Sequence, residues 1–517
     1  MVDSWARWGM ANLMQMSWLK WLVVWPSGKV IELPIKTSYT EWLSPLEYFI
    51  SAHWARKWRA DTALRTADAG YLTRRLCDST QEVIVKTNDC GTEDYITITR
   101  YDDNYLDYIN GRISVEDVYS PVNSQVIVLK WSIIDKNHIQ VIQSEWVEMI
   151  KVRSPLNCTV INWVCQKCFG TDLSTRKLIK IGTPIGIIAS QSLGEPGTQL
   201  TMNTRHAWWA ATEKWDIIGG IDRVNELLEA RTPNRKAIIS PFDGKANIHY
   251  VGKNIELEII WQSEKKIYYV KEELKIWVKI WEFIKKWTVI AGKGTTKIKS
   301  NEDGEVLEIK KDSVTIWTKT VFKKEISAGT LPKVKDWQVV RKWETLTGWL
   351  LDPRELQVVL WDLAAQVYIV DQIEKVYREQ AQSINKKYIE IIVKQMFSKV
   401  LIEDSGDSTF IPWSIAKYED FVKVNEKLEA DNKFPSIGHR MIFGLTSIAK
   451  ESDSRLSSAS FQETVRTMVE NSLKWSIDNL NDLKSNVILG RLLPIGKNFK
   501  WELEVEVAPQ FTEEIIE

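Results

Sequence analysis

Four of the five cysteines are spaced like the ligands of one metal ion. Cys90, Cys158, Cys165 and Cys168 read as C-x67-C-x6-C-x2-C. A C-x2-C pair lets two thiolates grip one Zn²⁺ at ~2.3 Å. Cys158 is close enough in sequence to join that pair, and Cys90 would complete the tetrahedron from a distance. A redox pair is the alternative, but no thioredoxin-like βαβ pattern surrounds it. Cys77 is left over as a small buried hydrophobe.

The composition is that of a soluble globular protein. The chain has 517 residues, 26% charged and 44% hydrophobic, with 68 Lys+Arg against 68 Asp+Glu. These values exclude a collagen, a wholly disordered chain and a disulfide-dense miniprotein. A prior of roughly 150 residues per domain gives about three or four domains. The sequence lacks an 18-residue apolar run and a signal-peptide pattern, and it has few cysteines, so we expect no membrane span and a cytoplasmic location.

One long helix is predicted from about 46 to 76. Ser44-Pro45-Leu46-Glu47 is a helix start, with a capping serine, a first-turn proline and a Glu that can close a capping box. Ala60, Ala63 and Ala67 share one face at helical spacing. With basic flanks, this face would let a polyanion approach the backbone. An ordinary buried helix with solvated arginines stays the alternative.

Other segments show weaker patterns. Alternating residues predict strands at 82–86 and 95–99 in a β-rich stretch over 80–150, and at 255–260 in a second stretch over 236–345. Two helices around an irregular tip are expected within 184–231. A long helical pattern returns over 353–400, and 456–485 is also expected to be helical.

One segment occurs twice in the second β-rich stretch. Residues 278–290 and 334–346 share Lys at the second position and Trp residues six apart. This resembles the half-motif of barrel-sandwich (lipoyl-like) folds, in which the two tryptophan positions are glycines at tight turns. Trp281, Trp287, Trp337 and Trp343 occupy them here.

The segment Gly186–His206, GIIASQSLGEPGTQLTMNTRH, is the most specific motif of the chain. It resembles the trigger loop of the largest catalytic subunit (beta-prime) of bacterial-type DNA-directed RNA polymerase. The segment 48–75 resembles the bridge helix of that family, and the four cysteines match its second zinc site. Further similarity is found at 221–231 (the returning trigger helix), and at 387–396, 458–466 and 486–495 (the C-terminal clamp and switch region).

The resemblance implies template-directed nucleotidyl transfer. Its bridge helix would turn Arg65, Thr66, Ala67, Gly70 and Arg74 toward nucleic acid and nucleotide. In its trigger loop, Gln199, Met202 and His206 would close on the incoming NTP, with His206 beside the pyrophosphate as a positional or acid catalyst.

Two positions depart from the family, which usually has Arg in place of Asn203 and an aromatic residue in place of Arg205. A phosphate contact is therefore lost or moved by two residues. On a helix two residues correspond to about 200°, so simple replacement is doubtful.

The Asp-rich loop that binds Mg²⁺ in the family has no counterpart in this sequence. We therefore expect a C-terminal part of the subunit, a natural half or a gene fragment, inactive without the chain that binds Mg²⁺. The implied partners are the DNA template, the RNA–DNA hybrid, NTPs, the N-terminal part of beta-prime, the beta, alpha and omega subunits and a sigma factor. The alternative is a non-catalytic zinc-containing scaffold or gene fragment that only binds partners; an adjacent reading frame with the Asp-rich loop would decide between them.

The expected fold is multidomain α+β with seven segments. They are a lead-in over 1–43, the bridge helix over 44–78, a zinc-stapled β-rich region over 79–183, a trigger-loop helical hairpin over 184–231, a barrel-sandwich β insertion over 232–350, a helical C-terminal clamp and switch piece over 351–496, and an acidic tail over 497–517.

Tryptophan is abnormally frequent. The chain has 26 Trp and 24 Gly, and Trp stands where the family has Gly at Trp54, Trp58, Trp163, Trp208 and Trp209. If every Trp were Gly, glycine would make up 50 of the 517 residues, a share slightly above the usual ~7%. UGA codons that mean Gly, translated as Trp, would explain this. The alternative is that evolution has replaced these glycines by tryptophan, which would place large rings at tight turns where only glycine fits. The hypothesis predicts Trp residues with positive φ, and Trp208 and Trp209 exposed on the loop tip.

Overall fold

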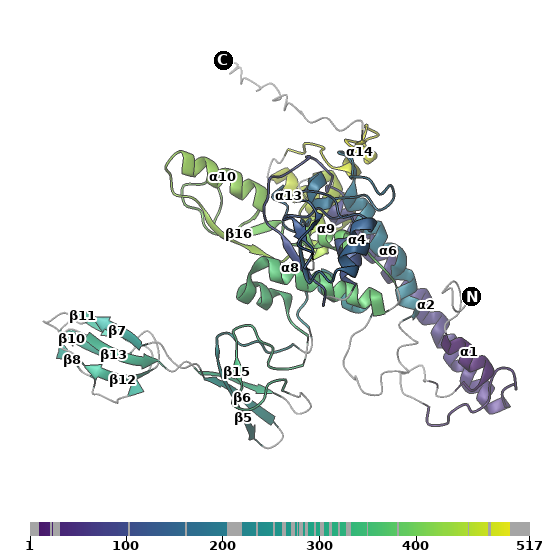
Figure 1. The fold of residues 1–517 in the computed structure, drawn as a ribbon, viewed down its shortest axis with the longest axis horizontal. Helices are drawn as coiled ribbons and strands as arrows, with labels where there is room; N and C mark the ends of the chain where they lie inside the picture. The colour runs from purple at the N-terminus through teal and green to yellow at the C-terminus, as the bar shows by residue number, and fades with distance from the viewer. Residues whose placement is uncertain are drawn as a thin grey trace, which may run out of the picture. The chain divides into compact units, whose positions relative to one another are not determined.

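The protein is a mixture of helices and small sheets that divides into two compact units, Met1–Arg231 with Gln366–Glu517, and Thr232–Ala365. Figure 1 shows the computed structural model. The residues it describes are 10–20, 23, 31–101, 104–121, 123–160, 163–203, 220–233, 236–251, 254–260, 265–269, 275–276, 278, 283–284, 288–293, 296–299, 304–309, 313–318, 321–326, 332–348, 350–379, 382–452, 454–473 and 477–496.

Helix α2, Pro45–Thr80, is the longest element of the first unit, and a short helix α1, Met10–Ser17, precedes it. The predicted capping box is present: the Glu47 amide donates to Ser44 Oγ at 3.4 Å, and the Ser44 amide donates to Glu47 Oε2 at 3.0 Å. At ~1.5 Å per residue, 36 residues extend about 54 Å. The sequence therefore predicted the start of this helix correctly and its end four residues too early.

Helix α6, Ile185–Asn203, lies against α2 (Figure 1). The two backbones approach closely because α6 carries glycines at the contact. A Cβ on Gly186 would lie 1.9 Å from the Thr80 carbonyl oxygen, and one on Gly194 would lie 2.4 Å from Thr73 Oγ1. Thr80 Oγ1 also donates to the Gly186 carbonyl at 3.0 Å.

Helix α7, Ile221–Leu228, returns to the same long helix. Arg75 of α2 donates to Asn225 Oδ1 at 2.7 Å and pairs with Glu229 just beyond α7. Both helices predicted within 184–231 are therefore present, and the tip between them, 204–219, lies outside the described residues.

The cysteine-bearing region packs around a core that includes Ile109, Ile134 and Ile142. Its strands β1 (Ile96–Thr99) and β4 (Met149–Val152) pair antiparallel, as do β2 (Val118–Tyr119) and β3 (Val126–Val128). Helices α3 (Tyr105–Ile109), α4 (Lys136–Ser144) and α5 (Gln166–Phe169) complete it.

The predicted strand at 82–86 is wrong. Val83, Ile84 and Val85 are all buried rather than alternately exposed. The segment makes one isolated bridge, from Val85 to Val164. It is therefore an irregular connection that leaves α2 through the interior.

The second unit is β-rich, as predicted for 236–345. One sheet has the order β14 (Val321–Ile326), β6 (Asn254–Ile260), β5 (Gly244–Val251) and β15 (Val339–Val340). A second has β7 (Lys265–Tyr269), β13 (Ser313–Thr318), β12 (Gly304–Ile309) and β9 (Phe283–Ile284), and a third β11 (Thr296–Lys299), β10 (Val289–Lys293) and β8 (Lys275–Ile276). The identity of these sheets as a barrel-sandwich stays a prediction.

The helical pattern over 353–400 is divided rather than continuous. Helix α8, Pro353–Glu379, breaks at Trp361, which has φ 71° and ψ 170°. Helix α9, Lys386–Met396, follows, and the end of the pattern is strand β16, Lys399–Asp404. Strand β16 lies between β17 (Ile415–Lys417) and β18 (Ile437–Met441). The remaining helices are α10 (Tyr418–Ala430), α11 (Leu445–Lys450), α12 (Arg455–Phe461), α13 (Thr464–Leu473) and α14 (Leu483–Ile488).

Tryptophan accounts for half of the described non-glycine residues with positive φ. Seven of the 14 described non-glycine residues with positive φ are Trp, at 42, 131, 146, 337, 343, 361 and 413. A side chain disfavours this conformation, which glycine adopts freely. The prediction of Trp at positive φ is therefore confirmed, including both Trp residues of the second repeat copy. Trp208, Trp209, Trp281 and Trp287 lie outside the described residues.

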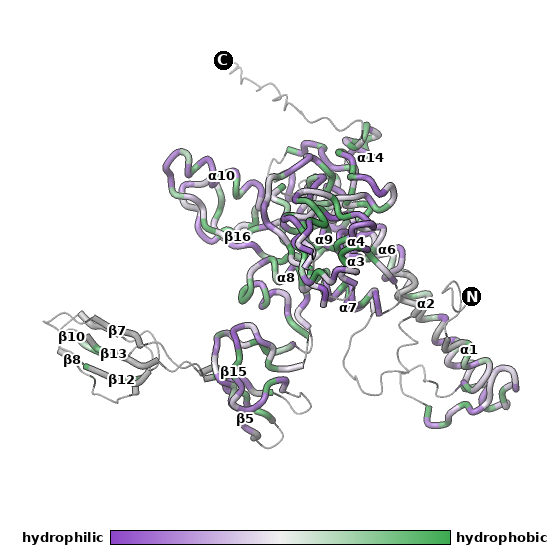
Figure 2. The backbone as a smooth tube through the Cα atoms, in the orientation of Figure 1, coloured by the Kyte–Doolittle hydropathy of each residue, from purple (hydrophilic) through white to green (hydrophobic). Residues whose placement is uncertain are grey.

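Helix α2 carries hydrophilic as well as hydrophobic residues along its length, so it has no continuous apolar stretch, and the tube of Figure 2 shows no long hydrophobic run there. Among the described residues, no helix is both long and apolar enough to cross a bilayer.

Candidate metal centre and helix interface

The four predicted cysteine ligands converge. The sulfurs of Cys90, Cys158, Cys165 and Cys168 all lie within 4.8 Å of one another, and those of Cys90 and Cys168 are 3.5 Å apart. Cys158, Cys165 and Cys168 are buried, and Cys77 stands outside the group as predicted. Tetrahedral zinc needs four soft ligands gathered at this scale. The donor set and its spacing therefore fit one structural zinc ion.

Backbone amides donate hydrogen bonds to two of the sulfurs, which stabilises negative charge on them. The Cys168 amide donates to Cys165 Sγ at 3.3 Å, because Cys165 is the N-cap of α5, and the Cys165 amide donates to Cys158 Sγ at 3.5 Å. Such N–H···S contacts are typical of a zinc knuckle, in which each ligand must be a thiolate.

Hydrogen bonds within the cluster shift the pKa values of the four thiols in opposite directions. Bonds from the other three thiols lower the pKa of Cys90, and a bond from Cys165 is the main cause that lowers the pKa of Cys158. The same contacts raise the pKa of Cys165 and Cys168. Metal binding requires that all four protons leave.

Two cations that the sequence analysis missed flank the cluster, the buried Arg153 and the half-buried Lys394. Arg153 Nη2 lies 3.0 Å from Cys90 Sγ and 3.3 Å from Cys168 Sγ. Lys394 of α9 donates to the carbonyls of Cys158, Val160 and Trp163 at 2.7–3.0 Å. The sequence gives only a weak signal for such residues. A buried thiolate cluster needs compensating positive charge, but this does not indicate which Lys or Arg supplies it.

Helix α9 also anchors the region through a buried ion pair. Arg112 donates to both carboxylate oxygens of Glu390, at 2.5 and 3.1 Å, and Ser154 Oγ donates to the same carboxylate at 2.7 Å. Burial opposes the charged carboxylate, but Arg112 and these hydrogen bonds prevail and lower the pKa of Glu390. The ammonium of Lys387 is also buried, 2.8 Å from the Gly111 carbonyl oxygen.

The small-residue face of α2 is exposed. Ala60, Ala63, Thr66, Ala67 and Gly70 are all accessible, and a Cβ on Gly70 would meet nothing within 4 Å. By contrast Ala69, Leu72 and Leu76 are buried. The helix therefore keeps one face packed and one face clear for most of the predicted nucleic-acid contacts.

Arg74 is already engaged within the chain. It donates to the carbonyls of Ser460 and Phe461 at the end of α12, at 3.3 and 3.1 Å. This contact positions α12 against α2. The side chain of Arg65 lies outside the described residues.

The predicted trigger-loop residues are only partly described. Gln199, Met202 and Asn203 are in the last part of α6, but their side chains lie outside the description, as do Arg205 and His206 entirely. Their roles stay predictions.

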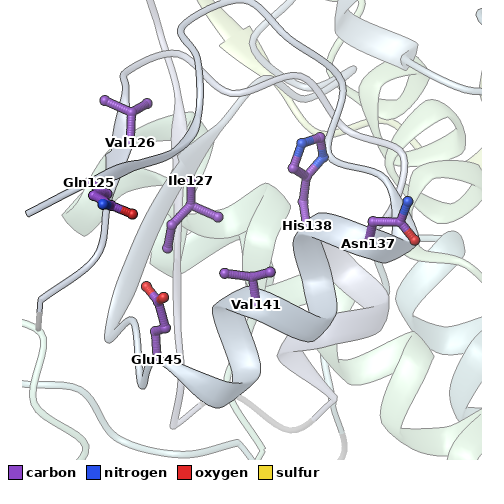
Figure 3. A pocket seen from close by; sticks show the side chains of 7 residues that line it. All are labelled: Gln125, Val126, Ile127, Asn137, His138, Val141 and Glu145. Atoms are coloured by element: carbon purple, nitrogen blue, oxygen red, sulfur yellow. The ribbon is translucent and has the colours of Figure 1, made fainter. Parts of the chain in front are cut away.

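A shallow cavity of about 270 Å³ lies between β3 and α4 (Figure 3). Val126, Ile127 and Val141 give it an apolar wall, and His138 and Glu145 also line it. None of the predicted site residues lines this cavity, so it offers no support for them.

Comparison with known proteins gives a consistent relationship over most of the chain. Residues 43–453 match the family described as RNA polymerase Rpb1, domain 5. The chain is 35% identical over 515 residues to the DNA-directed RNA polymerase subunit beta' of Desulforudis audaxviator, a match that covers 98% of this chain and 40% of that protein. It is 37% identical to the same subunit of Clostridioides difficile, over 97% of this chain and 39% of the relative. The chain thus spans about two-fifths of the length of these relatives.

Proposed function

Because this chain belongs to the RNA polymerase Rpb1, domain 5 family, we propose that it forms part of the catalytic core of a DNA-directed RNA polymerase. Its relatives are subunits of that enzyme by name. In this proposal α2 is the bridge helix, and α6, α7 and the residues between them are the trigger loop.

The packing of α6 and α7 on α2 is the observation that carries the proposal. Gly186 and Gly194 hold α6 against the long helix, and Arg75 holds α7 there. Helices α6 and α7 therefore both pack on a helix whose exposed face is built of small residues. A hairpin attached in this way can close over a nucleotide that rests on Thr66, Ala67 and Gly70.

The chemistry of nucleotidyl transfer suits such a lid. Phosphoryl transfer is catalysed mainly by positioning and by stabilising developing charge. Closure of Gln199, Met202 and His206 would orient the NTP and exclude water, and His206 would donate a proton or a hydrogen bond to the leaving pyrophosphate. Asn203 and Arg205 belong to the same closing segment, in which the phosphate contact of the family is either lost or moved by two residues.

The metals have separate places in this proposal. Zinc is structural and is held by the four cysteines. Mg²⁺ supplies the charge stabilisation of the transfer step when bound, and its carboxylates belong to another part of the enzyme. The DNA template, the RNA–DNA hybrid, the remainder of beta-prime, the other core subunits and a sigma factor are the proposed partners, in the cytoplasm.

His206→Ala in the assembled enzyme tests the lid. We expect slower single-nucleotide addition with nearly unchanged DNA binding, because the contact forms only on closure. His439→Ala is the control, since His439 is an exposed residue of β18 that pairs with Glu403. An equal loss of DNA binding and addition would instead indicate a structural histidine.

A further inference from the structure

Arg153 is a fully buried cation in contact with the cysteine cluster. Its side chain is 0% exposed. Nη2 lies 3.0 Å from Cys90 Sγ, 3.3 Å from Cys168 Sγ and 3.8 Å from Cys165 Sγ. A buried guanidinium is costly unless anions surround it. Three sulfurs therefore lie within reach of one nitrogen of this guanidinium.

The other end of the guanidinium is fixed by a carboxylate next to a ligand. Arg153 Nη1 donates to Asp89 Oδ1 at 2.8 Å, and the Gly91 amide donates to the same oxygen at 3.0 Å. Lys167 pairs with the second oxygen of Asp89 at 2.6 Å. Asp89 therefore orients Arg153, so that the planar fork points one nitrogen at the carboxylate and the other at the sulfurs.

The second cation near the cluster is half-buried and has a different task. Lys394 donates to three backbone carbonyls of the loop around Cys158, so it fixes the path of the chain. Arg153 instead touches the donor atoms themselves.

We propose that Arg153 is a positioning residue of the metal centre, which orients the sulfurs of Cys90, Cys165 and Cys168 and offsets their charge. The inference rests on the proposed zinc site. Four thiolates and one Zn²⁺ carry a net charge of −2, which a buried site must compensate. Hydrogen bonds from outside the ligand set also hold ligand atoms in place and typically change metal affinity by about 10–100-fold.

Zinc release from the purified full chain to a chromogenic chelator tests this role. Arg153→Met keeps much of the side-chain volume without charge or donors, and we expect release about 10–100-fold faster than from the wild type. Arg153→Lys should fall between them, because an ammonium keeps the charge but cannot fork between Asp89 and the sulfurs. In the Co²⁺-substituted protein, loss of the N–H···S bonds should shift the thiolate-to-cobalt absorption band.

Lys177→Ala is the matched control. It removes one positive charge from an exposed residue of the same region, outside the contacts described for Asp89 and Arg153. We expect release and a Co²⁺ band close to those of the wild type.

The outcomes separate the two hypotheses. A wild-type chain that purifies without zinc and does not take it up would overturn the metal site itself. Zinc held equally well by the wild type and Arg153→Met would overturn only the role of Arg153. Equal acceleration by Lys177→Ala would show that net charge matters and contact does not, which would overturn the positioning role. If Arg153→Met does not fold, Arg153→Lys and Asp89→Asn decide the question, and wild-type release and Co²⁺ bands in both would overturn the proposal.

Discussion

Four cysteine side chains that converge in the protein interior need nearby positive charges and hydrogen-bond donors to offset the negative charge of their thiolates. The loop around Cys158 is held by Lys394, and the sulfurs of Cys90 and Cys168 contact Arg153. Burial lowers the pKa of Lys394, and the charge of nearby cysteines opposes that shift. The local C-x2-C spacing predicted Cys165 and Cys168, whereas Cys158 was added for its nearness in sequence and the distant Cys90 to complete the four ligands that the resemblance also implies. The sequence could not predict the cations, because a compensating charge can come from any segment that the fold brings near.

The separation of Cys77 from the cluster gives a residue-scale prediction. The wild-type chain should carry one zinc ion per chain, and Cys158→Ser should lose most of it, because a hydroxyl is a poor replacement for a thiolate ligand. Cys77→Ser should retain the metal. Elemental analysis of the purified chains measures this, and zinc loss from Cys77→Ser would contradict the ligand assignment.

At the scale of elements, the contact between α2 and α6 depends on missing side chains. Gly194 faces Thr73 so closely that a Cβ would lie 2.4 Å from Oγ1 and 2.6 Å from Cγ2. Gly197, one turn away, would place a Cβ at 3.9 Å from Ala69 and Ile221, which is ordinary contact. The two glycines thus offer a matched pair.

Gly194→Ala should destabilise the chain by about 1–3 kcal/mol, because the added methyl group overpacks the helix contact. Gly197→Ala should be neutral or stabilising by about 0.5–1 kcal/mol, because alanine favours a helix over glycine. Thermal unfolding of both variants measures the difference. Similar unfolding midpoints would show that α6 does not pack on α2 as described.

The elements differ in how far the sequence could predict them. The start of α2 followed from Ser44 and Glu47, because a capping box is a local interaction. The segment 82–86 was wrongly predicted as a strand. Its run of β-branched residues looks like a strand in the sequence, but tertiary packing buries these residues at consecutive positions of an irregular segment. The break in α8 could not be predicted for another reason. It occurs at Trp361, and a tryptophan in the sequence does not indicate a residue with positive φ.

Helix α9 carries a buried lysine that makes stability depend on pH. Burial lowers the pKa of Lys387 to about 7, with Arg112 adding to the effect and Glu390 opposing it. Below pH 7 the folded and unfolded states are both protonated, and the cost of burying the charge is complete. Between pH 7 and about 10.4 only the unfolded state binds the proton, so stability should rise with pH.

Lys387→Met should remove this dependence. We expect the difference in unfolding midpoint between the variant and the wild type to change steadily from pH 7 to pH 9.5, in the direction that favours the wild type at high pH. Parallel profiles of the two proteins would show that Lys387 does not titrate in this range.

Across the whole molecule, the tryptophan positions raise a question about the composition of the natural chain. Six of the seven Trp residues with positive φ are exposed, so their rings contribute little packing. Others make contacts: Trp163 Nε1 donates to the Glu82 carbonyl at 3.1 Å, and Trp54 packs near Ile31 and Ile35. Backbone conformation therefore supports glycine most strongly at the seven positions.

We predict that the natural protein has glycine at these positions and at Trp208 and Trp209. Mass spectrometry of the tryptic peptide from His206 to Lys214 of the native protein measures the last two directly. Trp in that peptide would end the hypothesis of a reassigned UGA codon.

Recombinant variants test the backbone argument separately. Trp361→Gly should stabilise the recombinant chain by roughly 1–2 kcal/mol, because it removes a side chain from a left-handed residue. Trp18→Gly is the control, since Trp18 is exposed without positive φ and should gain nothing. Equal effects of both substitutions on the unfolding midpoint would refute the backbone argument.

The clamp of Lys394 on the carbonyl of Cys158 joins residues that are 236 positions apart. A ribosome adds about 5–20 residues per second, so α9 emerges roughly 10 to 50 seconds after the cysteines. Throughout that interval the nascent cysteine loop has left the ribosome, but the lysine that will fix it has not yet emerged. The early sulfurs are therefore open to competing soft metals and to oxidants, and the final fidelity of the site depends on how quickly zinc reaches a half-made chain.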